Sequence, residues 1–109
     1  MFPTNEHNMA EAKVEAATDM LNKTCLVTGA TAAIGLVTAR ELARMGASVV
    51  LVGRDSARCK SVVASIVRDT GNANVSCLVA DLSSQAEVRR LAAEFLSAHK
   101  RLDVLVNNA

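Results

Sequence analysis

An unbroken run of strand-forming apolar residues, SVVLV at 48–52, constrains the fold of this chain more than any other feature. β-Branched residues and leucine follow one another here with no polar position between Val49 and Val52. A continuous run of this kind is typical of a strand that is buried on both faces of a parallel sheet. Parallel neighbours need long crossover connections, which are usually helices that cover the sheet. The run therefore predicts an α/β protein.

Strand-like and helix-like segments alternate along the rest of the chain. Polar cap residues precede the second and third helical segments, and Gly46 and Gly71 follow the first and second. We expect strands at 24–27, 48–52, 74–80 and 102–106, and helices at 34–45, from Asp55 or Ser56 to Gly71, and from Ser83 or Ser84 onward. This β-α-β-α-β-α-β order predicts an open parallel sheet with flanking helices, of the doubly wound kind.

Helical spacing places several apolar residues of each expected helix on one side. In the third helix, Glu87 follows the cap candidate Ser84 by three residues, which is the spacing of a capping box. The shared face of the first helix is expected to hold Ile34, Thr38, Leu42 and Met45, and the buried stripe of the third helix Val88, Leu91, Ala92, Phe95 and Leu96.

The first 22 residues differ in composition from the rest of the chain. The segment MFPTNEHN is polar and contains the only proline, whereas residues 9–22 are rich in helix formers. No apolar core with a basic flank marks a secretory signal in this region. We therefore expect residues 1–22 to be a partly helical N-terminal extension and residues 23–109 to form the domain.

Composition excludes several classes of function. The net charge of +1 and the aromatic content of 2% argue against a nucleic-acid-binding surface. No apolar run reaches the roughly 18 residues that a membrane span needs. The cysteines Cys25, Cys59 and Cys77 have neither disulfide-framework nor metal-site spacing, so reduced thiols and no metal site are expected. These features favour a cytoplasmic protein.

A glycine-containing turn follows the first expected strand, in the sequence TGATAAIG at 28–35. Such a turn lies at the carboxyl end of a parallel sheet, where open α/β folds bind ligands. The free N–H groups of the next helix favour phosphate there. Gly29 would supply the sharp turn, and Gly35 would let the helix pack closely. Leu36 and Val37 stand where a P-loop needs lysine and a hydroxyl residue, which excludes that motif.

Four motifs in this order resemble the short-chain dehydrogenase/reductase family: TGATAAIG at 28–35, GR at 53–54, ADL at 80–82 and LDVLVNNA at 102–109. The resemblance covers residues 23–109, and the segments GRD at 53–55 and NANVSCLVADL at 72–82 look most like retinol-dehydrogenase-like or oxidoreductase-like members. It implies an NAD(P)-binding Rossmann-like domain, of which only the first half is expected here, ending inside the family's N-N-A-G motif. Ala33 replaces the middle glycine of the first motif and adds one methyl group near the expected cofactor.

The resemblance also implies roles for individual residues. The turn from Gly29 through Ala32, with Ile34 and Gly35, corresponds to the part that holds the diphosphate and ribose. Asp81, with Leu82 beside it, corresponds to the acid that binds the adenine amino group, and Asn107 corresponds to an asparagine that braces the sheet. The cofactor-binding residues expected on this basis are Gly29, Ala30, Thr31, Ala32, Ile34, Gly35, Arg54, Asp81, Leu82, Asn108 and Ala109.

The residue after the second strand predicts the choice of cofactor. Members of the family that prefer NAD usually place an acid there, bonded to the ribose 2′-hydroxyl. This chain has Gly53 and then Arg54, whose guanidinium suits the 2′-phosphate of NADP. Asp55 is better placed as a helix cap, and Arg58 could assist Arg54. NADP is therefore favoured over NAD, with a solvated surface charge as the other interpretation of Arg54.

Catalytic residues cannot be assigned within this chain. The family's Ser, Tyr and Lys follow the N-N-A-G motif, and the chain contains no tyrosine. The main expectation is the cofactor-binding part of an oxidoreductase that transfers hydride to or from a carbonyl or alcohol. A small-molecule substrate and a homo-oligomer are expected only for a full-length form. The alternatives are a non-catalytic dinucleotide-binding module and a truncated interaction partner of a full-length relative.

Overall fold

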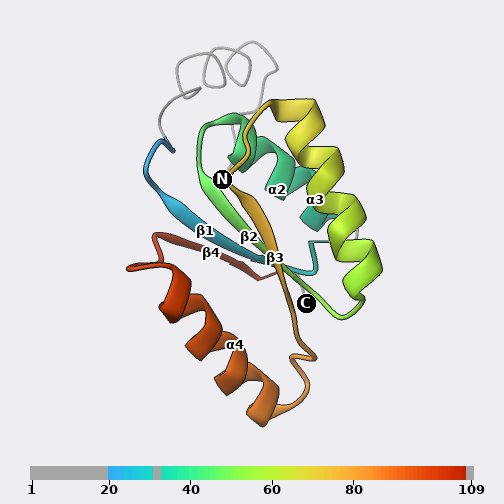
Figure 1. Cartoon of the computed structure of the whole chain (residues 1–109), viewed down its shortest axis with the longest axis vertical. Helices are drawn as coiled ribbons and strands as arrows, with labels where there is room; N and C mark the ends of the chain where they lie inside the picture. Colours follow the sequence, from blue (N-terminus) through green and yellow to red (C-terminus); the bar gives the residue numbers. More distant parts are fainter. Residues whose placement is uncertain (1–19, 31–32, 108–109) are drawn as a thin grey trace, which may run out of the picture.

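A parallel four-stranded sheet in the order β3-β2-β1-β4 forms the centre of the computed structural model, which describes residues 20–30 and 33–107 (Figure 1). The strands are β1 (Thr24–Thr28), β2 (Ser48–Gly53), β3 (Val75–Val79) and β4 (Val104–Asn107), and the helices are α2 (Ala33–Arg44), α3 (Ser56–Thr70) and α4 (Gln85–Ala98). The predicted alternation and parallel pairing are confirmed. The expected helical extension at 1–22 lies outside the described residues except for its last three.

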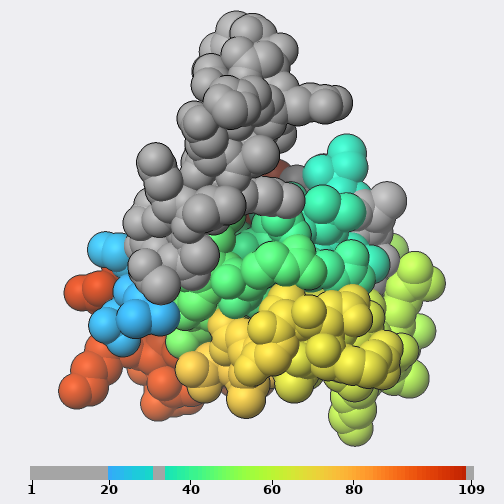
Figure 2. Space-filling view, turned by 90° about the horizontal axis from the view of Figure 1, so that it is seen from above, coloured from blue at the N-terminus to red at the C-terminus, as the bar shows by residue number. Residues whose placement is uncertain are grey.

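Helices cover both faces of the sheet (Figure 1). α2 and α3 lie together on one face, where the green α2 and the yellow end of α3 are in direct contact in Figure 2. α4 lies on the opposite face and packs against β3. The main core, beneath α2 and α3, consists of Cys25, Val27, Ala30, Ala39, Ala43, Ala47, Val49, Leu51, Ile66 and Val75.

The second strand is buried on both faces, as its apolar run predicts. Every side chain from Val49 to Val52 is at most 1% exposed. Val49 and Leu51 belong to the core under α2 and α3, whereas Val52 packs with Ala80 and Leu91 on the α4 side. Parallel neighbours on both edges complete the hydrogen bonding of β2. The predicted position of this strand inside a two-sided core is confirmed.

Local signals place the ends of the helices where they were expected. Asp55 caps α3, with its carboxylate accepting a hydrogen bond from the Arg58 N–H at 3.2 Å. Gly71 ends α3 at φ 73°, and Gly46 follows α2 at φ 94°. Ser84 caps α4 by accepting from the Glu87 N–H at 3.3 Å. Side-chain oxygens and left-handed glycines therefore set these boundaries.

The prediction that Ile34 lies on the packed face of α2 was wrong, because its side chain is 75% exposed. The helix instead buries Gly35, Ala39 and Ala43, which recur every four residues. Small side chains allow the helix axis to approach β1 and β2 closely, so less bulk is needed to fill the interface. An apolar pattern that gives most weight to large residues overlooks such a face.

The expected stripe of α4 is only partly buried. Leu91 and Phe95 are buried, but Val88 is 42% and Leu96 is 66% exposed, and Ala92 is also exposed. Within the described part of the chain α4 meets the sheet mainly at β3, so only a narrow strip of the helix is covered. The capping box is also half formed, because the Glu87 carboxylate turns to Arg90 instead of the Ser84 N–H.

Two of the cysteines are not the free thiols that the sequence predicted. A disulfide joins Cys59 on α3 to Cys77 on β3, with Cα atoms 5.9 Å apart. Cys25 is free and buried in β1. The two partners are 18 residues apart in the sequence. Spacing alone could not pair them, because it does not show that the first turn of α3 lies over the middle of β3.

The connection between α3 and β3 is fastened by the side chain of Asn72. Its amide donates to the backbone oxygens of Ala43 at 2.9 Å and Ala47 at 2.7 Å, while its oxygen accepts from the Asn74 N–H at 2.8 Å. The residue is half-buried. One side chain therefore joins the end of α2 to the chain that enters β3.

Replacing Asn72 with alanine is expected to lower the free energy of unfolding by about 2 kcal/mol, because three backbone groups lose a partner. Urea denaturation of both proteins measures the difference. Asn74→Ala is the matched control: the residue is exposed, so a loss below about 0.5 kcal/mol is expected. Equal losses for the two variants would contradict the assigned role of the Asn72 side chain.

Candidate nucleotide-binding site

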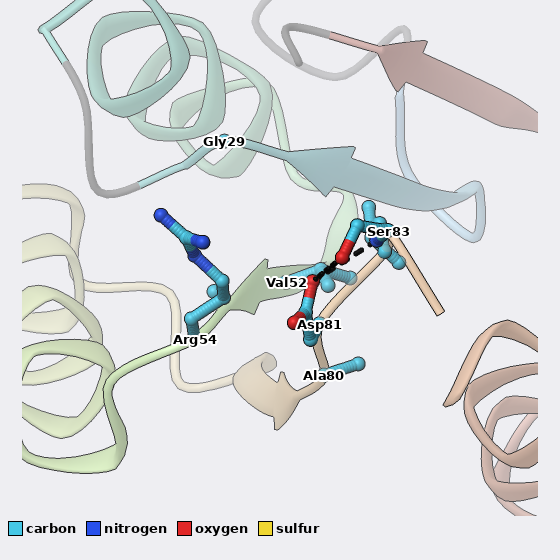
Figure 3. A pocket seen from close by; sticks show the side chains of 8 residues that line it. Gly29, Val52, Arg54, Ala80, Asp81 and Ser83 are labelled. Carbon is cyan, nitrogen blue, oxygen red and sulfur yellow. Dashed lines mark hydrogen bonds between the residues drawn. The ribbon is translucent and has the colours of Figure 1, made fainter. Parts of the chain in front are cut away.

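A pocket of about 380 Å³ opens at the carboxyl ends of β1, β2 and β3 (Figure 3). Parallel strands bring these three ends to one edge of the sheet, so residues far apart in the sequence meet there. Each strand contributes its last residue or the turn that follows. The lining residues are Gly29, Val52, Gly53, Arg54, Ala80, Asp81, Leu82 and Ser83.

The turn after β1 forms one wall of the pocket and has a tightly restricted backbone. Gly29 adopts φ 63°, a conformation that side chains other than glycine rarely tolerate. A Cβ at Gly35, in the first turn of α2, would lie 2.1 Å from the Gly29 carbonyl oxygen and 3.0 Å from the Ala30 Cα. The start of α2 therefore rests directly on the turn. Ala30 is fully buried behind the pocket.

Two side chains of opposite charge flank the pocket on neighbouring strand ends. Arg54 is exposed and extends from the end of β2 on the side of Gly29, as Figure 3 shows. Asp81 follows β3, and its Oδ1 accepts hydrogen bonds from the Ser83 N–H at 3.0 Å and the Ser83 hydroxyl at 2.7 Å. The pocket thus offers an exposed cation on one side and a hydrogen-bonded carboxylate on the other.

The two hydrogen bonds from Ser83 hold the pKa of the Asp81 carboxyl below its ordinary value of 3.8, and the nearby Arg54 charge adds to this effect. Because the pKa is lowered in the folded state, the charged carboxylate favours folding at neutral pH. That contribution is fully present above pH 3.8 and is lost as the pH falls through the lowered pKa. Asp81 is therefore ionised and able to accept hydrogen bonds at neutral pH.

Removing the Ser83 hydroxyl should raise the pKa of Asp81. In Ser83→Ala the backbone N–H still donates, so the pKa moves toward 3.8 and remains below it. Carboxyl-carbon NMR chemical shifts, followed through an acid titration of both proteins, measure the two midpoints. Ser97→Ala is the control, because its hydroxyl donates within α4 to the Glu94 carbonyl. An Asp81 midpoint that is the same in all three proteins would contradict this cause.

A brace from α4 holds the turn that carries Asp81. The Arg90 guanidinium donates to the Val79 carbonyl at 2.7 Å and to Glu87 Oε1 at 2.9 Å. The Glu87 carboxylate also lies 3.5 Å from the Asp81 N–H. This brace was not predicted from the sequence, although the three-residue spacing of Glu87 and Arg90 is a recognisable helical ion-pair signal.

A second polar contact joins β1 to β4 beside the pocket. The Thr28 hydroxyl donates to the Asn107 side-chain oxygen at 3.0 Å. Thr28 is only 6% exposed and pairs in register with Asn107. The carboxyl ends of the two strands are therefore joined by side chains as well as by the backbone ladder.

The expected cofactor-binding residues have different positions relative to the pocket. Gly29, Arg54, Asp81 and Leu82 line it, and Ala30 and Gly35 lie behind its wall. Ile34 is exposed and does not line it. Thr31, Ala32, Asn108 and Ala109 lie outside the described residues. Four further residues line the pocket that were not expected to bind the cofactor, and their places at or just after strand ends were the available signal: Val52, Gly53, Ala80 and Ser83.

Within residues 20–30 and 33–107, no three His, Cys, Asp or Glu side chains are grouped so that they could hold a metal ion. Among the helices in these same ranges, none is sufficiently long and apolar to cross a membrane.

The family model of the short chain dehydrogenase matches residues 23–109, which is most of the chain. The chain belongs to this family. Among relatives of this short-chain dehydrogenase chain, dehydrogenase/reductase SDR family member 13 of Homo sapiens is 43% identical over 91 residues, covering 84% of the chain and 24% of the relative. Retinol dehydrogenase 13 of Homo sapiens is 40% identical over 87 residues, and the match covers 80% of this chain and 26% of that relative.

Solved structures of the family have the same fold as this chain. A short chain dehydrogenase from Escherichia coli CFT073 complexed with NADPH is 33% identical with a TM-score of 0.77, covering 84% of this chain and 39% of that one. A short chain dehydrogenase from Shigella flexneri 2a str. 301 complexed with NADP is 33% identical with a TM-score of 0.76. The match covers 84% of this chain and 39% of that one. The chain thus spans about a quarter of the length of the curated relatives described above.

Proposed function

We propose that this chain is the cofactor-binding part of a short-chain oxidoreductase that uses NADP in preference to NAD. The observation that carries the proposal is the pocket at the strand ends, with Arg54 on one side and Asp81 on the other. NADP has a matching pair of groups, because its 2′-phosphate is anionic and its adenine carries an amino donor. The NADPH and NADP complexes of the two solved relatives support this choice.

Each pocket residue has a specific part in the proposal. The Arg54 guanidinium would pair with the 2′-phosphate through two N–H groups. The ionised Asp81 carboxylate would accept a hydrogen bond from the adenine amino group, with Leu82 against the ring. The start of α2 rests directly on the Gly29 turn, because Gly35 has no Cβ to keep them apart, and this brings the helix N-terminus close to the place proposed for the diphosphate.

The four expected residues outside the described ranges remain part of the proposal. Thr31 and Ala32 would continue the diphosphate-binding turn. Asn108 and Ala109 would lie near the adenosine ribose, after Asn107 at the end of β4. Ile34 is also proposed to contact the cofactor, because its exposed side chain at the start of α2 is accessible to a ligand on that side.

A bound nicotinamide cofactor supplies hydride transfer to or from a carbonyl or alcohol carbon. We assign to this chain the binding and orientation of the adenosine and diphosphate groups. The chain contains no tyrosine, and no residue in it is assigned the acid/base role. A small-molecule carbonyl or alcohol substrate and a homo-oligomeric assembly are proposed for the whole protein.

Binding of two isomeric nucleotides tests the proposal without any catalytic step. Adenosine 2′,5′-bisphosphate carries the phosphate that distinguishes NADP, whereas adenosine 3′,5′-bisphosphate has the same charge in a different place. Isothermal titration should give at least about tenfold tighter binding of the 2′,5′ isomer, because one charge-assisted pair contributes about 1.5 kcal/mol. Equal affinities would refute the preference for NADP, and no binding of either isomer would refute the nucleotide site.

A further inference from the structure

The disulfide between Cys59 and Cys77 connects the two segments that carry the charged side chains of the pocket. Cys59 lies in the first turn of α3, which begins just after Arg54 and its neighbour, the cap residue Asp55. Cys77 lies in the middle of β3, which leads directly to Ala80 and Asp81. The cross-link therefore joins the Arg54 side of the pocket to the Asp81 side.

Only one backbone hydrogen bond outside the β2–β3 ladder adds to this link at the pocket edge within the described part of the chain, from the Ala80 N–H to the Gly53 carbonyl at 3.0 Å. The position of Arg54 also depends on β2, which ends at Gly53 in register with Val79, and on the packing of α3 over β3. A covalent bond between the first turn of α3 and β3 restricts that packing directly. The state of the cysteine pair is thus expected to affect the pocket.

The two cysteine residues differ in exposure, which suggests an order of reaction. Cys59 is 1% exposed, whereas Cys77 is half-buried on the outermost strand of the described sheet. Their Cα separation of 5.9 Å falls within the range usual for disulfides. A reagent in solution can therefore reach Cys77 first, with Cys59 close enough to complete the bond.

The third cysteine offers an internal comparison. Cys25 is fully buried in β1, and burial raises the pKa of its thiol, with the Asp103 carboxylate adding to the shift. A buried thiol with a raised pKa is a poor nucleophile. Cys25 should therefore remain a thiol under conditions in which the other two react.

We propose that Cys59 and Cys77 are a reversible redox-modification site that reacts with small disulfides such as glutathione disulfide, and that its state sets the affinity of the adjacent pocket for 2′-phosphorylated adenine nucleotides. The second part rests on the proposed function. Disulfides in reducing compartments are typically transient and regulatory, so the proposal is compatible with a chain that also exists as a dithiol.

The reaction is a pair of thiol–disulfide exchanges. The Cys77 thiolate attacks one sulfur of glutathione disulfide, forms a mixed disulfide and expels one glutathione thiolate. The Cys59 thiolate then attacks the Cys77 sulfur, forms the internal disulfide and expels the second glutathione. The protein loses two protons and two electrons, and glutathione disulfide is reduced to two glutathione molecules. Excess glutathione reverses both steps.

The cross-linked form is expected to bind nucleotide more tightly. In the dithiol form, the first turn of α3 keeps its packing and its Asp55 cap but loses its covalent link to β3. Ordering that turn on binding then costs conformational entropy that the disulfide has already removed. We expect reduction to weaken binding of adenosine 2′,5′-bisphosphate by about 3- to 10-fold.

Mass spectrometry of the protein after equilibration in glutathione buffers tests the modification itself. The samples are quenched in acid, unfolded and alkylated. Oxidised protein should carry one alkyl group, on Cys25, and reduced protein should carry three, one for each cysteine. Cys77→Ser should carry two under every condition, and Cys25→Ser should still cross-link. Three alkyl groups on the wild-type protein in every buffer, or a bond to Cys25, would overturn the proposal.

Titration of adenosine 2′,5′-bisphosphate into the same oxidised and reduced samples tests the coupling. A weaker affinity on reduction, absent in Cys77→Ser, supports it. Equal affinities in both states overturn the coupling and leave the proposed nucleotide site intact. No binding in either state refutes the proposed function and the coupling together, while the alkylation pattern still decides whether the cysteine pair reacts.

Discussion

Replacing Gly35 with alanine is expected to lower the free energy of unfolding by about 3 kcal/mol. The added Cβ would lie 2.1 Å from the Gly29 carbonyl oxygen and 2.8 Å from the Gly29 carbonyl carbon. Both atoms belong to the backbone of a turn, so neither can move aside as a flexible side chain would. The helix must therefore shift away from the turn, which also disturbs the buried contacts of Ala39 and Ala43. Urea denaturation monitored by circular dichroism measures the loss.

Gly71→Ala is the matched control for that variant. Gly71 has a positive φ of 73°, but nothing lies within 4 Å of the position of an added Cβ. The cost is then limited to the left-handed conformation, about 1 kcal/mol. If Gly35→Ala were no more destabilising than Gly71→Ala, the close approach of α2 to the turn would not be what makes glycine necessary at position 35.

Reversing the charge at Arg54 is expected to weaken NADPH binding about 100-fold and to leave NADH binding within about threefold. Arg54→Glu removes a charge-assisted pair with the 2′-phosphate and puts a repelling carboxylate in its place. NADH carries a hydroxyl at that position, so it loses no ion pair. Dissociation constants for both cofactors, measured at one ionic strength because such pairs are screened by salt, give the two ratios.

Arg68→Glu makes the same change of charge at the far end of α3 and serves as the control. Arg68 lies in the last turn of that helix, whereas Arg54 precedes its first turn. Binding of both cofactors to Arg68→Glu should remain close to that of the unaltered protein. An equal loss in the two variants would indicate a general effect of net charge, and an equal loss of NADPH and NADH in Arg54→Glu would place Arg54 outside the 2′-phosphate site.

Local signals in the sequence predicted much of the fold because they act over a few residues. The run from Val49 to Val52, the cap at Asp55 and the glycine at position 71 each specify a strand or a helix end without help from distant residues. The packed face of α2 depends instead on how close a helix can approach a strand. That distance depends on the tertiary structure and cannot be read from helical spacing. Ile34 was therefore expected on the packed face of α2, but its side chain is exposed.

The candidate site shows the same division. The sequence predicted that Gly29, Arg54 and Asp81 lie at one site, because parallel strands end at a common edge of the sheet. The brace from Arg90 to the Val79 carbonyl and the bond from Cys59 to Cys77 depend on the angle and register at which helices cross the sheet. Neither quantity is encoded in the spacing of residues along the chain.

The two walls of the pocket differ in how freely their sequences can change. The turn at Gly29 is confined by backbone atoms of α2, so most substitutions at Gly35 meet a steric barrier before any ligand is involved. Arg54 is an exposed residue on a short connection, where exchange of one side chain leaves the core unaltered. If the proposed function holds, cofactor preference can evolve at position 54 while the turn at Gly29 stays constant, and redesign toward NADH should begin at Arg54.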